Sequence, residues 1–145
     1  MNTLTVPCSS CSKKNRIPAS KQHLQPKCGH CKAPISLTNQ AVPVELGDQD
    51  FHDFVKHASL PVMVDFFSPT CGPCRTMLPI VSAMAREYVN KFIIATVDTS
   101  KNQQLAIFFN IRGVPSFMFF ENGTLIDQIS GAVGRNVLEQ KLESL

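Results

Sequence analysis

From residue 41 onward, hydrophobic and polar positions alternate between strand-like runs and helix-like spacings. A nearly unbroken apolar run at 61–67 is typical of a strand that is covered on both faces. After it, apolar side chains recur at helical spacing over 72–89, which predicts a long helix. The same reasoning predicts the remaining elements, which are strands at 41–46, 91–97, 114–120 and 125–129 and helices at 49–58, 101–109 and 134–144. The pair Asn122-Gly123 favours a tight hairpin between the last two strands.

This order of elements predicts an α/β domain with a central sheet, partly parallel and partly antiparallel, and helices on both faces. Pro79 falls inside the long helix and is expected to kink it. No apolar run approaches the roughly 18–20 residues of a membrane helix, and the N-terminal residues lack the apolar stretch of a secretory signal. We therefore expect a cytoplasmic protein without membrane contact, in a reducing compartment.

The first forty residues differ in composition from the rest. They contain six basic and no acidic side chains, whereas the other 105 residues contain 8 basic and 11 acidic ones. All ten Phe and the single Tyr lie beyond residue 50, so the N-terminal part cannot build an ordinary hydrophobic core alone. We predict a small module at 1–38 and a larger domain at 39–145.

Four cysteines in the small module form two Cys-x-x-Cys pairs with the spacing of a zinc site. They are Cys8, Cys11, Cys28 and Cys31. Four thiolates complete a tetrahedral shell without an open position, so we expect one structural Zn²⁺ that supplies folding energy. The alternatives are two structural disulfides, a site in which His30 replaces one cysteine, and a catalytic role for Cys28-Gly-His-Cys31.

A third pair, in Cys71-Gly72-Pro73-Cys74, joins a predicted buried strand to a predicted helix. A helix N-terminus favours an anion, so the pKa of Cys71 should be lowered and its thiolate fraction raised. Cys74 should lie one turn inside the helix and be more shielded. Gly72 keeps the approach to Cys71 open, and Pro73 is tolerated at a helix start. We interpret the pair as a redox-active dithiol rather than as half of a metal site or two core cysteines.

The segment VDFFSPTCGPCR (64–75), the Gly-Val-Pro at 113–115 and the late hairpin resemble the thioredoxin family. This resemblance covers about residues 42–145 and implies the thioredoxin fold, preceded here by a zinc-ribbon-like module. With that module and the Asn-Arg-Ile-Pro at 15–18, the chain resembles the thioredoxin 2 type of the family. The resemblance implies a protein-disulfide reductase with Cys71 as the attacking thiolate and Cys74 as the resolving thiol. It also implies two kinds of partner, disulfide-containing client proteins and an NADPH-dependent thioredoxin reductase. We expect a monomer.

The resemblance also implies roles for residues around the pair. Asp65, a carboxylate in an apolar strand, should have a raised pKa and exchange a proton with Cys74, unless it is a structural Asp on an outward bend. Pro115 matches the family's cis-proline and would place the Val114 backbone beside the disulfide, with an ordinary trans proline as the alternative. Gly131 matches a glycine that lets clients approach, although a simple turn explains it nearly as well. The expected substrate groove comprises Thr70, Gly72, Pro73, Val114 and Gly131.

Three positions depart from the family's pattern. Thr70 and Phe67 stand where thioredoxins usually carry tryptophan. Thr96 stands where a lysine is often found near the buried aspartate. Without that cation, Asp65 should titrate higher than in a typical thioredoxin.

Three other functions compete with disulfide reduction. A disulfide oxidase or isomerase is disfavoured by Cys-Gly-Pro-Cys, because the dipeptide between the cysteines helps to set the reduction potential. Six cations favour nucleic-acid binding by the module, but it has no aromatic side chain for base stacking, so we expect no nucleic-acid partner. A redox-sensing module, in which oxidation of the four thiolates ejects the metal, is compatible with the enzyme.

Overall fold

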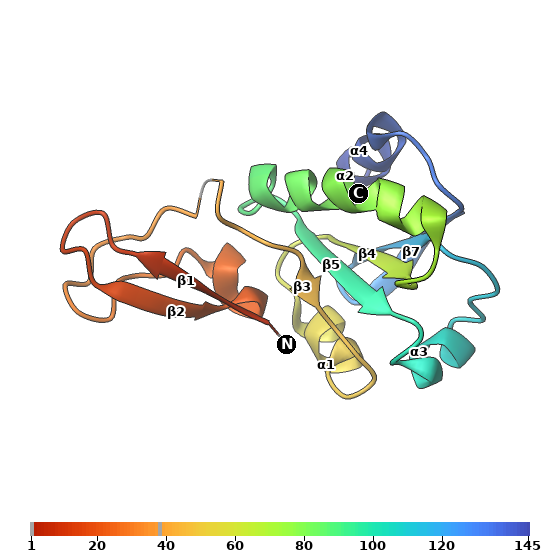
Figure 1. Cartoon of the computed structure of the whole chain (residues 1–145), viewed down its shortest axis with the longest axis horizontal. Helices are drawn as coiled ribbons and strands as arrows, with labels where there is room; N and C mark the ends of the chain where they lie inside the picture. The colour runs from red at the N-terminus through yellow and green to blue at the C-terminus, as the bar shows by residue number, and fades with distance from the viewer. Residues whose placement is uncertain (1, 38) are drawn as a thin grey trace.

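A computed structural model of the chain describes residues 2–37 and 39–145. The strands β1 (Thr3–Pro7) and β2 (Lys14–Pro18) form a small antiparallel ribbon, and five further strands form a second sheet. Figure 1 shows the ribbon projecting from the side of the larger domain at which β3 lies. The predicted boundary falls at residue 38, which lies outside the described residues, and the division into two domains remains a prediction.

The large sheet has the mixed character that the order of elements predicts. Its strands are β3 (Val44–Glu45), β4 (Val62–Phe67), β5 (Ile93–Asp98), β6 (Ser116–Glu121) and β7 (Thr124–Ser130), in the spatial order β3-β5-β4-β6-β7. The pairs β3–β5 and β4–β5 are parallel, whereas β4–β6 and β6–β7 are antiparallel. The β6–β7 hairpin turns at Asn122 and Gly123, whose φ angles of 52° and 79° are those that a type I′ turn requires.

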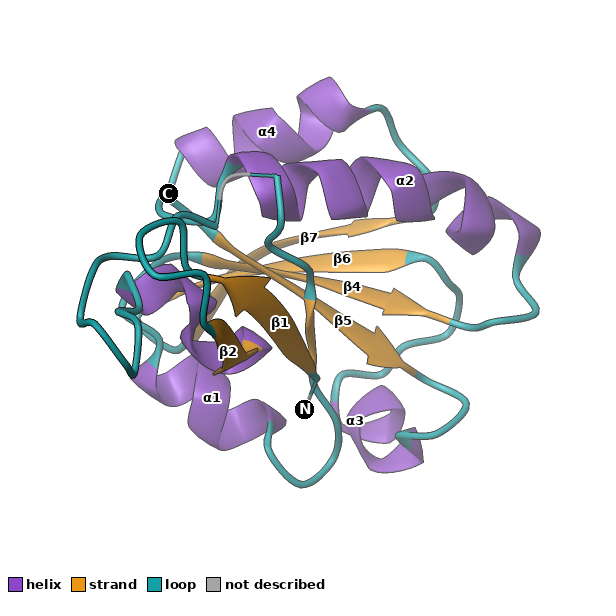
Figure 2. Cartoon of the chain, turned by 60° about the vertical axis from the view of Figure 1, so that its left-hand side comes forward, coloured by secondary structure: helices purple, strands orange, loops and turns teal. Residues whose placement is uncertain are grey.

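Helices cover both faces of this sheet, as Figure 2 shows. They are α1 (Phe51–His57), α2 (Gly72–Glu87), α3 (Gln103–Phe108) and α4 (Arg135–Glu143). Alternate residues of β4 enter different cores: Val64 packs in the cluster with α1 and α3, and Met63 packs in the cluster with α2 and α4. Asp65 therefore lies on the α2 side of the sheet. No helix among the described residues is long and apolar enough to cross a membrane.

Two predicted strands begin later than their sequence pattern indicates. The run at 114–120 becomes β6 only at Ser116, after a cis peptide bond between Val114 and Pro115. The strand predicted at 41–46 is reduced to β3, two residues long. Before β3, the backbone of Val42 bonds to a side chain of the N-terminal module instead of to a strand. Pro79 lies within α2, and the kink expected there stays a prediction.

The N-terminal module contains elements that the sequence pattern does not reveal. Besides β1 and β2 it has a 3-10 helix, η1 (Ala19–Leu24). Its small apolar cluster includes Val6, Ile17 and Leu37 but is completed by Val89, beyond the end of α2. Ala19 is buried in the core that α1 and β3 share. The module is thus packed against the larger domain, which agrees with the expectation that it has no sufficient core of its own.

Two amide side chains fasten the module to the segment before β3. The Asn2 side chain donates to the carbonyl of Pro43 at 3.0 Å and accepts from the N–H of Glu45 at 3.0 Å. Gln22, which is buried, donates to the carbonyl of Val42 and accepts from its N–H. These four bonds give partners to backbone groups at the exposed edge of the sheet.

Candidate active site and metal centre

Cys71 and Cys74 lie where the chain passes from β4 into α2. A disulfide joins them, with their Cα atoms 5.2 Å apart. Cys71 caps the N-terminus of α2, and its Sγ accepts a hydrogen bond from the backbone N–H of Cys74 at 3.2 Å. Cys74 is only 1% exposed, whereas Cys71 is partly exposed. Of the two sulfur atoms, that of Cys71 is the one that a partner can approach, and the helix terminus favours its thiolate after reduction.

The loop before β6 lies directly beside this disulfide. The Val114–Pro115 peptide bond is cis, which is the geometry that the resemblance implies. The carbonyl oxygen of Val114 lies 3.5 Å from Cys71 Sγ. Gly131, directly after β7, donates its N–H to the carbonyl of Pro115 at 2.8 Å, which places the end of β7 beside the cis peptide bond.

Gly131 keeps its part of this surface free of side-chain atoms. Its φ of +93° is unfavourable for any residue with a Cβ, and no atom lies within 4 Å of where a Cβ would stand. Gly72, Pro73 and Thr70 are exposed around Cys71. The Thr70 hydroxyl lies 3.1 Å from the Ser68 hydroxyl, so a pair of hydroxyl groups precedes Cys71.

Asp65 is buried beneath this surface, on the side of the sheet that α2 covers. It is fully inaccessible to solvent, and neither carboxylate oxygen has a hydrogen-bond partner. Burial raises the pKa of Asp65 from 3.8 to about 7. In the register of the sheet its neighbours are Thr96 on β5 and Phe117 on β6. Neither is a cation that could stabilise the carboxylate, so the raised pKa follows from uncompensated desolvation.

The four cysteines of the N-terminal module converge at the far end of the β1–β2 ribbon. Their sulfur atoms all lie within 4.8 Å of one another, and none of the four forms a disulfide. Two of the separations are 3.6 Å and 3.7 Å. Tetrahedral Zn²⁺ with bonds of about 2.3 Å places its sulfur ligands about 3.8 Å apart, so these residues fit such an ion.

The two pairs adopt the same local structure. In the first, the N–H of Cys8 donates to the carbonyl of Lys13 and the N–H of Ser12 donates to the carbonyl of Cys8. In the second, the N–H of Cys28 bonds to the carbonyl of Ala33 and the N–H of Lys32 bonds to that of Cys28. Both Ser12 and Lys32 have a φ of 66°. Each pair is therefore a tight knuckle rather than the start of a helix, which removes the structural basis for a catalytic Cys28-Gly-His-Cys31.

Backbone amides point at the sulfur atoms of these knuckles. The N–H groups of Cys31 and His30 lower the pKa of the Cys28 thiol to about 6. Backbone N–H groups lower the pKa of the Cys8 thiol in the same way. The lowered pKa values favour the thiolate forms of Cys28 and Cys8, which are the forms that bind a metal, whereas burial and the neighbouring thiols raise the pKa of Cys11 to about 11. His30 takes part through its backbone N–H and not through its ring, because the converging group consists of the four cysteines alone within the described residues.

Asn15 is a residue of this centre that the sequence analysis did not single out. Its side chain donates to Cys28 Sγ at 3.6 Å and to the carbonyl of Lys13 at 3.0 Å, and it accepts from the N–H of Gly29 at 3.0 Å. It thus links the first knuckle to the second. Asn15 belongs to the Asn-Arg-Ile-Pro segment that carried part of the family resemblance. That resemblance is the only feature of the sequence that could have pointed to this residue.

Comparison with known proteins identifies both parts of the chain. Residues 42–144 match the family model described as Thioredoxin, and residues 7–33 match the model described as Thioredoxin 2, N-terminal. Thioredoxin C-3 from Corynebacterium nephridii is 33% identical over 141 residues, which span 97% of this chain and 94% of that one. Thioredoxin 1 from Nostoc sp. is 38% identical over 99 residues, 68% of this chain and 92% of its own.

A solved structure also resembles the larger domain of this chain. A mutant thioredoxin from Halobacterium salinarum superimposes with a TM-score of 0.65 at 29% identity. The match covers 71% of this chain and 89% of that chain.

Proposed function

This chain belongs to the thioredoxin family and is a thiol–disulfide oxidoreductase, and we propose that it reduces protein disulfides through the sulfur atoms of Cys71 and Cys74. The observation that most strongly supports this assignment is their unequal exposure. Cys71 is partly exposed at the start of α2, and Cys74 lies behind it, buried and within bonding reach. An accessible nucleophile and a shielded resolving group are what the two steps of disulfide exchange need.

The proposed reaction transfers two electrons to the client. The thiolate of Cys71 attacks one sulfur of the client disulfide, a mixed disulfide forms, and the other client sulfur leaves as a thiolate. Cys74 then loses its proton and attacks Cys71 Sγ. The Cys71–Cys74 disulfide forms, the client's second sulfur leaves, and the client ends as a dithiol after taking up two protons.

Asp65 is the proposed acceptor of the Cys74 proton. It lies on the face of β4 that α2 covers, and its pKa of about 7 makes its carboxylate a base of suitable strength at neutral pH. The cis Val114–Pro115 bond and Gly131 leave backbone groups accessible beside Cys71. We assign this strip of backbone as the place where a client strand pairs, with Thr70, Gly72 and Pro73 on its other side.

The remaining assignments concern partners, metal and location. We propose that an NADPH-dependent thioredoxin reductase restores the dithiol, that the protein is a cytoplasmic monomer, and that the four-cysteine centre holds one Zn²⁺. When bound, zinc would cross-link the two knuckles and has no open position for chemistry. The residues that would hold it are Cys8, Cys11, Cys28 and Cys31.

The experiment is reduction of insulin disulfides by the full chain, supplied with thioredoxin reductase and NADPH. NADPH oxidation should depend on the protein and on insulin, and Cys71→Ser should abolish it. Cys11→Ser is the matched control, because it removes a thiol of the metal centre and not of the proposed active site. Equal activity of Cys71→Ser and the unmodified protein would refute the assignment.

A further inference from the structure

The cations of the N-terminal module are not neutralised by the rest of the protein. The six are Lys13, Lys14, Arg16, Lys21, Lys27 and Lys32, and all are exposed. None forms an ion pair with a described residue, whereas cations of the larger domain such as Arg135 and Lys141 do. The first forty residues contain no acidic side chain at all. The module therefore presents a surface of one sign to solvent.

These cations are also not engaged by the metal centre. The hydrogen bonds to the sulfur atoms of the metal centre come from backbone N–H groups, from Asn15 and from the other cysteines of the centre. A zinc ion with four thiolates carries a charge of about −2, which the six cations outweigh. The module thus stays positively charged when it is loaded with metal.

The β1–β2 ribbon gathers part of this charge on one face. Lys14 and Arg16 alternate along β2 and are exposed, while Ile17 points into the module's own cluster. Across the ribbon, Lys14 is paired with Pro7 and Arg16 with Thr5, both on β1. We call this exposed surface, formed by Thr5, Pro7, Lys14 and Arg16, the cationic face. It contains neither an acidic nor an aromatic residue.

We propose that the cationic face docks acidic segments of client proteins and so selects which disulfides reach Cys71. This inference rests on the proposed function, because it names a class of client for that reaction. Charge complementarity supports it: the first forty residues carry a net charge of +6 and attract acidic segments, whereas the charges of the rest of the chain sum to −3. A protein is favoured over a nucleic acid, because the module has no aromatic side chain on which bases could stack.

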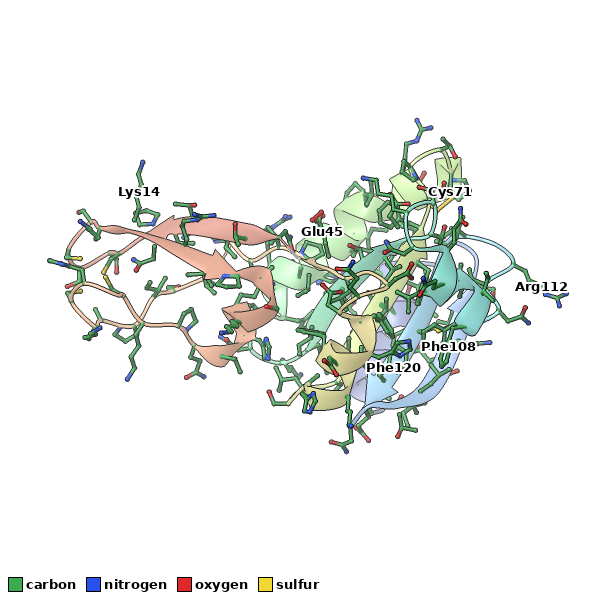
Figure 3. All side chains as sticks on the ribbon, turned by 90° about the horizontal axis from the view of Figure 1, so that it is seen from below. Lys14, Glu45, Cys71, Phe108, Arg112 and Phe120 are labelled. Atoms are coloured by element: carbon green, nitrogen blue, oxygen red, sulfur yellow. A yellow bond between two sulfur atoms is a disulfide. The ribbon has the colours of Figure 1, made fainter. Side chains whose placement is uncertain are left out.

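The cationic face lies far from the Cys71–Cys74 disulfide. Figure 3 shows Lys14 on the module, toward the left, and Cys71 on the larger domain, toward the right, well apart from each other. A client that uses both must therefore carry its acidic segment at some distance along the chain from its disulfide. Docking then raises the effective concentration of the disulfide at Cys71 only when the intervening segment can span the two places.

The test compares synthetic disulfide peptides as substrates of the metal-loaded full chain. One carries an oligoaspartate tail on a flexible Gly-Ser linker of about 20 residues, a second carries an oligoasparagine tail, and a third has the acidic tail with a linker of about 4 residues. At low salt we expect kcat/KM for the first peptide to exceed that for the other two about fivefold, and this preference to vanish near 0.5 M salt.

Two double variants test which cations cause the preference for the acidic peptide. Lys14→Gln combined with Arg16→Gln should remove the preference and leave reduction of the asparagine peptide unchanged. Lys56→Gln combined with Lys101→Gln is the control, because it removes the same charge from exposed positions of the larger domain and should keep the preference. Zinc content of each variant shows that its module is intact.

Three results would overturn the proposal. The first is equal kcat/KM for aspartate and asparagine tails in the unmodified protein. The second is an equal loss of preference in the control variant. The third is tight, Lys14- and Arg16-dependent binding of a single-stranded oligonucleotide without any preference among peptides, which would assign the face to nucleic acid. Failure to reduce any of the peptides would instead count against the proposed function itself.

Discussion

Asp65 on β4 lies directly opposite Thr96 on β5, and no hydrogen bond reaches either oxygen of the buried carboxylate. A threonine at this place leaves the carboxylate without a neighbouring positive charge. The buried group is consequently held near the midpoint of its titration at neutral pH, with a pKa of about 7.

Substitution of Thr96 by lysine should lower the pKa of Asp65 substantially. An ammonium within about 4–6 Å favours the carboxylate and offsets part of the desolvation. The measurement is an NMR titration of the Asp65 carboxyl carbon in the oxidised protein. Thr96→Met is the control, since it adds length without charge and should leave the pKa raised. Equal pKa values in the two variants would show that charge at this position does not control the titration.

Substitution of Asp65 by asparagine should stabilise the protein, and more so at high pH. The folded-state pKa of about 7 lies above the ordinary value of 3.8, so the folded state binds more protons between these limits. Stability therefore falls as pH rises from about 4 to about 7 and stays low above that. Removing the carboxyl should recover up to about 4 kcal/mol at pH 8 and little at pH 4. Denaturant unfolding at both values checks this, and a gain that is independent of pH would contradict it.

Asn15→Ala should weaken metal binding by the four-cysteine centre. The side chain donates to Cys28 Sγ and joins the two knuckles, and loss of such an outer partner typically costs about 10–100-fold in affinity. Competition with a chromophoric zinc chelator measures this. Asn90→Ala, at an exposed position of the larger domain, should have no effect. An unchanged affinity for Asn15→Ala would mean that the knuckles are held by the thiolates alone.

Gln22→Ala should destabilise the folded chain by about 1–3 kcal/mol. The buried side chain satisfies both backbone groups of Val42, and its removal leaves them without partners. Thermal unfolding of the metal-loaded protein is the measurement. Gln25→Ala is the control, because Gln25 is exposed. If the two variants unfold alike, the amide contact contributes nothing to docking of the module.

The larger domain could be predicted well because its pattern is local. The apolar run at 61–67 and the Asn122-Gly123 turn determine a buried strand and a hairpin through interactions between near neighbours. Alternation along β4 likewise places Asp65 on one face of the sheet once α2 is known to cover that face. In each of these features the burial pattern and the backbone preference of the residues predict the same local structure. The family resemblance predicted the same fold.

The N-terminal module could not be predicted in the same way. β1 and β2 are five residues long and each buries only one residue, Val6 and Ile17, so their alternation is too short and too weakly apolar to predict a strand. Its shape depends on contacts between distant segments, such as those of Asn15 with the second knuckle and of Gln22 with Val42. Cysteine spacing revealed the metal centre, but polar side chains that hold backbone from elsewhere in the chain leave no periodic signal.

The most direct test of the whole account is to trap the first step of the reaction. Cys74→Ser should attack a client disulfide through Cys71 and stop there, because no thiol remains beside Cys71 to release the client. Mass spectrometry after incubation of the reduced variant with insulin should find a mixed disulfide at Cys71. Cys71→Ser should give no adduct at the proposed active site, since Cys74, the other cysteine of the pair, is buried. A trapped adduct on Cys74, or on the cysteines of the N-terminal module in place of Cys71, would contradict the account.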